Sequence, residues 1–336
     1  MTKILNEVLT IDADTKAEVV NKVAEIMRDV FVFPEIGVEM SDFVIKKLAD
    51  GEYDEFGEIK PFCKKLTSDL REICHDEHLF VFHSPAEAHE VESDKGQLSE
   101  EDTAIQKQAY LTWYERQNYG FQKVEILQGN IGYLKLDVFP LNAGAETCAN
   151  AMGFLANVNA IIIDLRDNGG GEGLVDFLSS YFFTSEQILL GSAKFRDASQ
   201  NSESRTLPYV PGKRLPDIDL YILTSSRTFS AAEAFAYDLQ QLKRAVIVGE
   251  KSKGGAHPVD VLIVKSDILT QVPIGCSYNP ITKTNWEGVG VMPDIVTSEE
   301  AALKTAQIIA LEKVIGKLSD KDYKTELNKV LDGLKT

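Results

Sequence analysis

The sequence predicts an α/β (α+β) fold with a helical N-terminal part. Residues 12–83 carry apolar side chains at three- and four-residue spacing, which is typical of amphipathic helices. Further along, short apolar runs alternate with helical patterns and glycine-containing turns. The chain has 336 residues, of which 44% are hydrophobic, so it can bury a large core and a smaller one.

Residues 1–85 are predicted to form a helical N-terminal subdomain. Thr15 and Glu18 have the spacing of a capping box for a first helix, which Pro34 is expected to end. A second helix is expected after Ser41 and a third over residues 59–74. The polar residues 86–118 are interpreted as a linker, and residues 119–336 as an α/β core domain with C-terminal helices.

Within the core domain, each element follows from a local pattern. Gly129-Asn130 lies between two apolar runs, which predicts a hairpin. Residues 143–157 read as an alanine-rich helix and residues 160–164 as a buried strand. Later in the chain we expect a second hairpin and two helices, over residues 259–264 with 269–274, 303–315 and 319–334.

Charge and cysteine content exclude several classes of protein. Lys and Arg number 35 against 52 Asp and Glu, and the net charge of -17 would repel a nucleic-acid backbone. No apolar run has the length of a membrane span, and the N-terminus lacks the pattern of a signal peptide. Four cysteines without a CxxC pair suggest no disulfide framework. We therefore expect a reduced, cytoplasmic protein without nucleic-acid or membrane partners.

The stretch from Ser225 to Gly255 is the first candidate for chemistry. An apolar strand runs into a polar turn, and after Ser230 the pattern becomes helical before a second buried strand at 245–248. Ser230 would thus open a helix between two core strands, where free N–H groups and the helix dipole favour negative charge. This is a suitable place for a nucleophile. The alternative is that Ser230 only caps the helix together with Glu233.

A glycine-rich loop over residues 164–173 is the second candidate. It joins a strand to a helix and lacks both the Gly-Lys-Ser/Thr ending of a P-loop and the spacing of a dinucleotide fingerprint. Its acidic members Asp167 and Glu172 would repel phosphate. The loop therefore fits a nest of N–H donors for a small oxyanion, although a purely structural turn remains open.

Four of the five histidines gather between residues 75 and 89. A zinc site built from Cys74, His75, His78 and His83 is conceivable, but the spacing matches none of the strong zinc signatures. For His83 and His89 solvated surface positions are favoured. We expect no metal and no cofactor.

Together, these stretches resemble the tail-specific (C-terminal processing) serine peptidase family, in particular its branch with the tricorn core protease and interphotoreceptor retinoid-binding protein. The resemblance implies a spiral ββα core like that of the crotonase and Clp-protease folds, without the PDZ module of other branches. It is carried by four blocks in order: residues 76–79 (DEHL), 164–170 (DLRDNGG), 225–249 with 254–258 (GGAHP), and 286–294 (WEGVGVMPD).

The resemblance also implies the site residues. The lysine of the Ser–Lys branch falls on Gly255, so it is missing, although Lys251 and Lys253 are near. In the tricorn-like pattern, His78 matches the general base and Glu287 the carboxylate that orients it. Glu77 stands where that pattern has a serine.

A second histidine and a set of backbone N–H groups complete the implied site. His257 is a rival base, although its position before Pro258 is typical of a hairpin. The N–H of Ala231 and that of Gly170 or Gly171 would form the oxyanion hole.

The implied function is a serine peptidase that hydrolyses peptides or unfolded protein through an acyl-enzyme on Ser230. Its expected partner is a peptide or unfolded-protein substrate, and a homo-oligomer is left open. The alternative is a catalytically inactive domain that binds a lipophilic, retinoid-like or peptide ligand, as the retinoid-binding relatives imply.

Overall fold

The computed structural model describes residues 9–94, 108–109, 111–171 and 173–335. The chain divides into two compact units. The first comprises residues 1–109, 193–201 and 257–277, and the second comprises residues 110–192, 202–256 and 278–336. The first unit thus takes two later segments from the residues that the sequence prediction assigned to the core domain. The predicted linker 86–118 overlaps helix α4 (Pro85–Asp94). Residues 95–107 and 110 of the predicted linker lie outside the described part.

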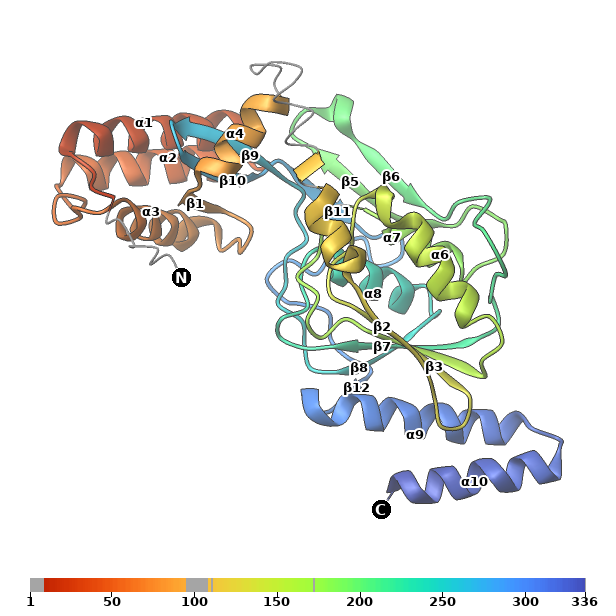
Figure 1. The fold of residues 1–336 in the computed structure, drawn as a ribbon. Helices are drawn as coiled ribbons and strands as arrows, with labels where there is room; N and C mark the ends of the chain where they lie inside the picture. The colour runs from red at the N-terminus through yellow and green to blue at the C-terminus, as the bar shows by residue number, and fades with distance from the viewer. Residues whose placement is uncertain (1–8, 95–107, 110, 172, 336) are drawn as a thin grey trace. The chain divides into compact units, whose positions relative to one another are not determined.

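The first unit combines four helices with a three-stranded antiparallel sheet of order β1-β10-β9. Buried apolar side chains from α1, α2, α3 and the hairpin strands form its core. Figure 1 shows these helices and strands as ribbons. The elements are α1 (Ala13–Val30), α2 (Pro34–Ala49), α3 (Ile59–Cys74), β1 (Phe80–His83), α4 (Pro85–Asp94), β9 (Val259–Lys265) and β10 (Ile268–Pro273).

Two details of these helices correct the sequence prediction. The cap of α1 is Asp12, whose side chain accepts the Thr15 N–H at 2.7 Å, so the predicted Thr15–Glu18 box is wrong. Pro34 does not end the first helix. It occupies the first turn of α2, where its missing N–H costs nothing, and α2 therefore starts well before Ser41.

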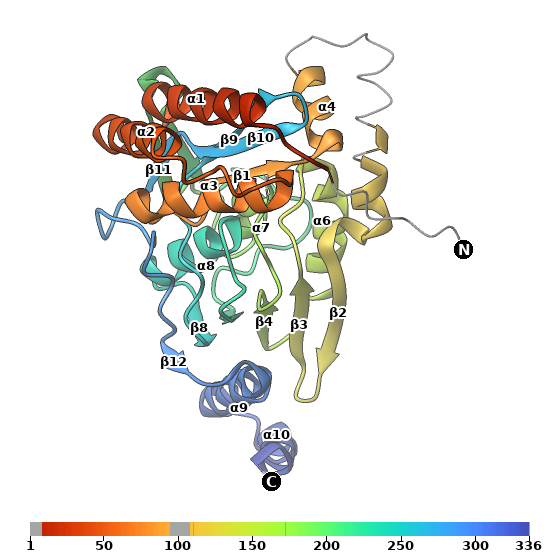
Figure 2. The same cartoon turned by 90° about the vertical axis from the view of Figure 1, so that its left-hand side faces the viewer.

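The second unit is built on a six-stranded sheet of order β12-β8-β7-β4-β3-β2 (Figure 2). The pairs from β12 to β3 are parallel, and the β2–β3 hairpin is antiparallel, as predicted around Gly129-Asn130. The strands are β2 (Phe121–Leu127), β3 (Ile131–Leu136), β4 (Ala160–Asp164), β7 (Asp219–Thr224), β8 (Val246–Gly249) and β12 (Ile295–Val296).

Helices cover both faces of this sheet, which explains why its central strands are mainly apolar. In β4, Ile161 and Ile163 join the core that contains α6 (Ala145–Phe154) and α8 (Ala231–Gln241). Ile162 points to the opposite face, where α9 and α10 pack. The predicted C-terminal helices are confirmed as α9 (Glu299–Lys317) and α10 (Lys321–Lys335).

The remaining elements are short. Strands β5, β6 and β11 form a sheet of order β11-β5-β6. Among the described residues, no helix combines the length and the apolar character that crossing a membrane requires. The short elements are η1 (Asn118–Gly120), η2 (Asn142–Gly144), α7 (Val175–Ser180), β5 (Leu189–Phe195), η3 (Ala198–Gln200), β6 (Ser202–Arg205) and β11 (Gly275–Tyr278).

Candidate active site

Ser230 lies at a strained turn between β7 and α8. It is half-buried, and its backbone has φ +54° and ψ −121°. An ordinary capping serine has an extended backbone, whereas a positive φ is uncommon for a residue with a side chain. Strain of this kind is concentrated at functional sites, and nucleophilic serines of hydrolases sit on such sharp strand-to-helix turns. The backbone of Ser230 therefore carries a signal that its sequence context did not.

The glycine loop packs directly against this serine. A Cβ added at Gly170, which has φ +106°, would lie 2.7 Å from the Cβ of Ser230. The N–H of Gly170 donates to the side-chain oxygen of buried Asn168 at 2.8 Å, so it is already engaged within the loop. Among the three predicted oxyanion-hole residues, Gly170 thus packs closely against Ser230, while its N–H is bonded within the loop.

Gly171 and Ala231 are better placed to offer N–H groups to a ligand. Both line a cavity of about 610 Å³ in the second unit. Ala231 is the first residue of α8, where an N–H has no acceptor inside the helix. Gly171 follows Gly170 and Ala231 follows Ser230, so two backbone donors of one cavity lining could hold a small anion.

Glu233 ties the serine turn to the loop that follows β8. One carboxylate oxygen accepts the Ser230 N–H at 2.9 Å and the Gly255 N–H at 2.8 Å. The other accepts the Ser252 hydroxyl at 2.5 Å and the Gly254 N–H at 2.6 Å. The side chain is fully buried, and burial raises its pKa, while these hydrogen bonds act in the opposite direction. The sequence analysis interpreted Glu233 only as a capping partner and missed this role.

Glu287 holds the end of the same loop. Its carboxylate accepts the Ala256 N–H at 2.5 Å, and the neighbouring Trp286 indole donates to the Gly255 carbonyl at 2.7 Å. Trp286 and Glu287 thus bind the two polar groups of the Gly255–Ala256 peptide unit. Lys253, one of the two lysines near the missing position, lies with its ammonium 4.5 Å from the centre of the Phe229 ring.

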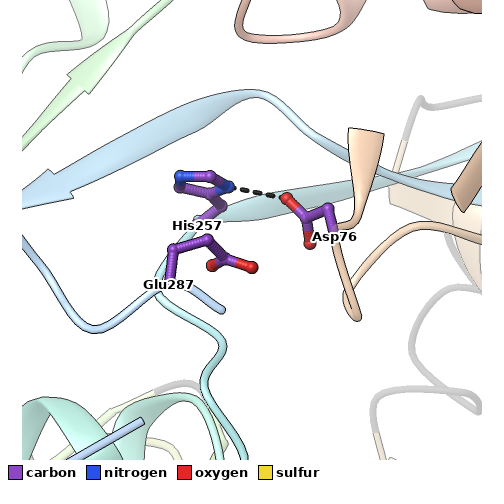
Figure 3. Close-up of side chains that lie close together, drawn as sticks. All are labelled: Asp76, His257 and Glu287. Atoms are coloured by element: carbon purple, nitrogen blue, oxygen red, sulfur yellow. Dashed lines mark hydrogen bonds and ion pairs between the residues drawn. The ribbon is translucent and has the colours of Figure 1, made fainter. Parts of the chain in front are cut away.

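In the first unit, Asp76 and His257 form a buried pair (Figure 3). Asp76 follows α3 and is 2% exposed, and its Oδ2 lies 2.6 Å from Nδ1 of His257, which is 8% exposed. An ionised carboxylate can only accept, so this contact favours the tautomer of a neutral His257 that carries its proton on Nδ1. A carboxylate that fixes the imidazole tautomer in this way is the arrangement that prepares a histidine to act as a base.

His78 occupies a different position around the same carboxylate. Its backbone N–H donates to Oδ1 of Asp76 at 2.8 Å, whereas its ring Nδ1 lies 3.9 Å from that oxygen. The side chain is 4% exposed, between α3 and β1 as predicted. Asp76 therefore contacts the backbone of one candidate base and the ring of the other. Sequence reasoning missed Asp76, although it opens the DEHL block.

The described residues provide no zinc site at the histidine-rich stretch. The ligand atoms of Cys74, His75, His78 and His83 do not converge within this part of the chain. His83 instead lies 3.9 Å from Asp267.

The sequence-predicted site residues fall into both units. His78 belongs to the first unit, whereas the second unit holds Ser230, Glu287, Gly170, Gly171 and Ala231. Their catalytic roles remain predictions.

Comparison with known proteins gives a consistent family signal. Residues 130–297 match the model of peptidase family S41, and residues 5–112 match the N-terminal domain of peptidase S41 in eukaryotic IRBP. The chain is 29% identical over 170 residues to carboxyl-terminal-processing peptidase 2, chloroplastic, of Arabidopsis thaliana. This match covers 49% of the chain and 31% of the relative, so the chain spans about a third of that protein's length.

Solved structures of other peptidases have a similar fold. A candidate peptidase of Parabacteroides merdae superposes with a TM-score of 0.62 at 16% identity, over 90% of this chain and 99% of the other. The tricorn protease gives a TM-score of 0.53 at 12% identity, over 96% of this chain and 37% of the other. At these identities the likeness concerns the fold, and it confirms the predicted mixed helix-and-sheet class.

Proposed function

The chain belongs to peptidase family S41, and on that premise we propose that it is a serine peptidase with Ser230 as nucleophile. The observation that carries the proposal is the strained backbone of Ser230. The residue that follows it, Ala231, lines one cavity together with Gly171. A serine that only capped α8 would need neither the positive φ nor the glycine packed against it. The expected substrate is a peptide or an unfolded protein segment.

In the proposed reaction, Oγ of Ser230 attacks the scissile carbonyl carbon while an imidazole takes its proton. The N–H groups of Ala231 and Gly171 stabilise the resulting oxyanion. When the carbon–nitrogen bond breaks, the imidazolium returns the proton to the leaving amine, and water then releases the acyl group by the same steps. In comparable sites each oxyanion donor contributes about 2.7–4 kcal/mol.

Two histidines are candidates for the base. The family pattern favours His78, with Glu287 as the orienting carboxylate. The 2.6 Å contact between Asp76 and His257 supports His257, because a carboxylate at Nδ1 favours the tautomer in which Nε2 accepts the proton. In that version Glu287 is a positioning residue, since it binds the Ala256 N–H next to His257. The proposal requires that one of these histidines meets Ser230 in the working enzyme.

Labelling with a fluorophosphonate probe tests the nucleophile. We expect an adduct on Ser230 in the folded protein and none in Ser230→Ala, with little change in unfolding free energy between the two. Absence of an adduct in the folded wild-type chain would refute the proposal. Loss of about 1 kcal/mol or more on Ser230→Ala would point to a capping role.

Paired variants identify the base. If His257 is the base, His257→Asn should lower the labelling rate by about three to four orders of magnitude, and Asp76→Asn should have a comparable effect because it fixes the wrong tautomer. His78→Asn is the matched control: it removes the other buried imidazole, and its labelling rate should stay within a few-fold of wild type. The opposite ranking would assign the base to His78. Circular dichroism spectra check that all three variants fold.

The second candidate function is a binding domain without peptidase activity. It is favoured by the match of residues 5–112 to the N-terminal domain found in eukaryotic IRBP. Saturable binding of a fluorescent fatty acid or retinoid by a chain that shows no adduct on Ser230 would support it.

A further inference from the structure

The cavity beside Ser230 has an apolar wall with one carboxylate. Its lining includes the apolar side chains of Leu174, Val175, Phe177 and Leu207, and the acidic side chain of Asp176, all from the second unit. Gly171 and Ala231 belong to the same lining, so the cavity starts where a scissile carbonyl would be held. With a volume of about 610 Å³, it has room for a long side chain.

Asp176 lies in this wall without a cationic partner among the described residues. Its carboxylate is half-buried and accepts a hydrogen bond from the Ser204 hydroxyl. Two arginines of the second unit are engaged elsewhere. Arg205 pairs with Glu203 at 2.9 Å, and Arg214 donates to backbone carbonyl groups, including that of Leu207 at 2.7 Å.

The acidic neighbour of Asp176 is Asp238, in α8, which is 6% exposed. Burial raises the pKa of Asp238, and repulsion from Asp176 adds to this increase. Burial likewise raises the pKa of Asp176. A carboxylate that is partly removed from water and pairs with no cation lacks a counter-charge, which a ligand can supply.

We propose that this cavity receives the substrate side chain on the acyl side of the scissile bond, the P1 side chain, and that Asp176 makes it selective for lysine or arginine. The aliphatic stem of such a residue would contact the apolar wall, and its cationic end would pair with Asp176. The net charge of -17 favours the approach of basic peptides as well. This inference rests on the proposed peptidase function and names its substrate class.

The test compares peptides that differ only at P1. Lysine and norleucine share an unbranched stem, and only lysine carries the ammonium group. We expect kcat/KM for lysine to exceed that for norleucine at least tenfold, which corresponds to about 1.4 kcal/mol. Asp176→Asn, which keeps an acceptor for Ser204, should lower kcat/KM for the lysine peptide to about that for the norleucine peptide. The matched control is Glu203→Gln, which removes an equal charge from neighbouring β6 and should leave the preference intact.

A binding assay separates this inference from the proposed function. In Ser230→Ala, p-aminobenzamidine should bind with a dissociation constant at least tenfold lower than in the double variant Ser230→Ala/Asp176→Asn. If Asp176→Asn does not fold, Leu207→Lys serves instead, because it adds a competing cation to the cavity wall.

The outcomes are distinct. A wild-type chain that is labelled on Ser230 but hydrolyses norleucine substrates as well as lysine substrates overturns the P1 assignment and leaves the peptidase proposal standing. A chain that is not labelled refutes the peptidase proposal. In that case, benzamidine binding that does not depend on Asp176 also refutes the proposed cation-binding pocket.

Discussion

The contact between Gly170 and Ser230 yields a prediction that can be worked out from distances. In Gly170→Ala the new Cβ would lie 2.7 Å from Ser230 Cβ, 3.0 Å from the Phe229 carbonyl oxygen and 3.1 Å from the Ala231 nitrogen. None of these atoms is the end of a flexible side chain, so the serine turn itself has to move. The φ of +106° adds backbone strain for any residue with a Cβ.

The expected loss of stability has two parts. Left-handed strain costs about 1–2 kcal/mol, and overpacking in a closed region costs about 1–3 kcal/mol. Their sum, about 2–5 kcal/mol, leaves most domains folded. Because the displaced atoms belong to Ser230 and Ala231, labelling should slow by about tenfold to a hundredfold even in the folded variant.

Gly169→Ala is the matched control. Its added Cβ meets nothing within 4 Å, and its φ lies outside the left-handed region. We expect its unfolding free energy to stay within about 0.5 kcal/mol of wild type, with an unchanged labelling rate. Urea denaturation and fluorophosphonate kinetics measure the two effects. If Gly170→Ala behaves like Gly169→Ala in both assays, the packing argument for the serine turn is wrong.

Two further predictions concern buried polar groups in the second unit. The Tyr133 hydroxyl donates to Asp164 at 2.6 Å, whereas the buried Tyr221 hydroxyl has no partner among the described residues. Tyr133→Phe should therefore lower the unfolding free energy by about 1–2 kcal/mol, whereas Tyr221→Phe should leave it unchanged or raise it by up to about 1 kcal/mol. Equal losses of unfolding free energy in urea denaturation would contradict this. Burial raises the pKa of Asp238 to about 7, so the folded chain keeps a proton that the unfolded chain loses near pH 4. The free energy of unfolding should therefore fall as pH rises from about 4 to 7. Asp238→Asn, which retains an acceptor for Asn279, should be more stable than wild type at pH 8 and should lack this part of the pH dependence. Parallel stability–pH curves for the two chains would argue against it.

Local patterns were sufficient for most of the secondary structure. The strand at 160–164 and the hairpin around Gly129-Asn130 depend on neighbouring residues, and both are confirmed. The start of α2 was mispredicted because a proline near a helical pattern can end one helix or begin the next. Only the packed structure shows that Pro34 begins a helix here.

The site could be predicted only in part, because its key contacts join distant segments. Asp76 and His257 are 181 positions apart, and no spacing rule connects them. Glu233 was visible as one half of a capping pattern, but its bonds to Ser252, Gly254 and Gly255 depend on how the loop after β8 folds back. The strained φ of Ser230 is likewise a property of the surrounding packing, which sequence patterns do not encode.

The discontinuous make-up of the first unit has a consequence for biosynthesis. Helices α1 to α3 leave the ribosome early, but the sheet that completes their core needs β10, which ends at Pro273. Until that hairpin emerges, the apolar faces of the nascent helices lack their final cover, and they would be the segment that chaperones contact during translation.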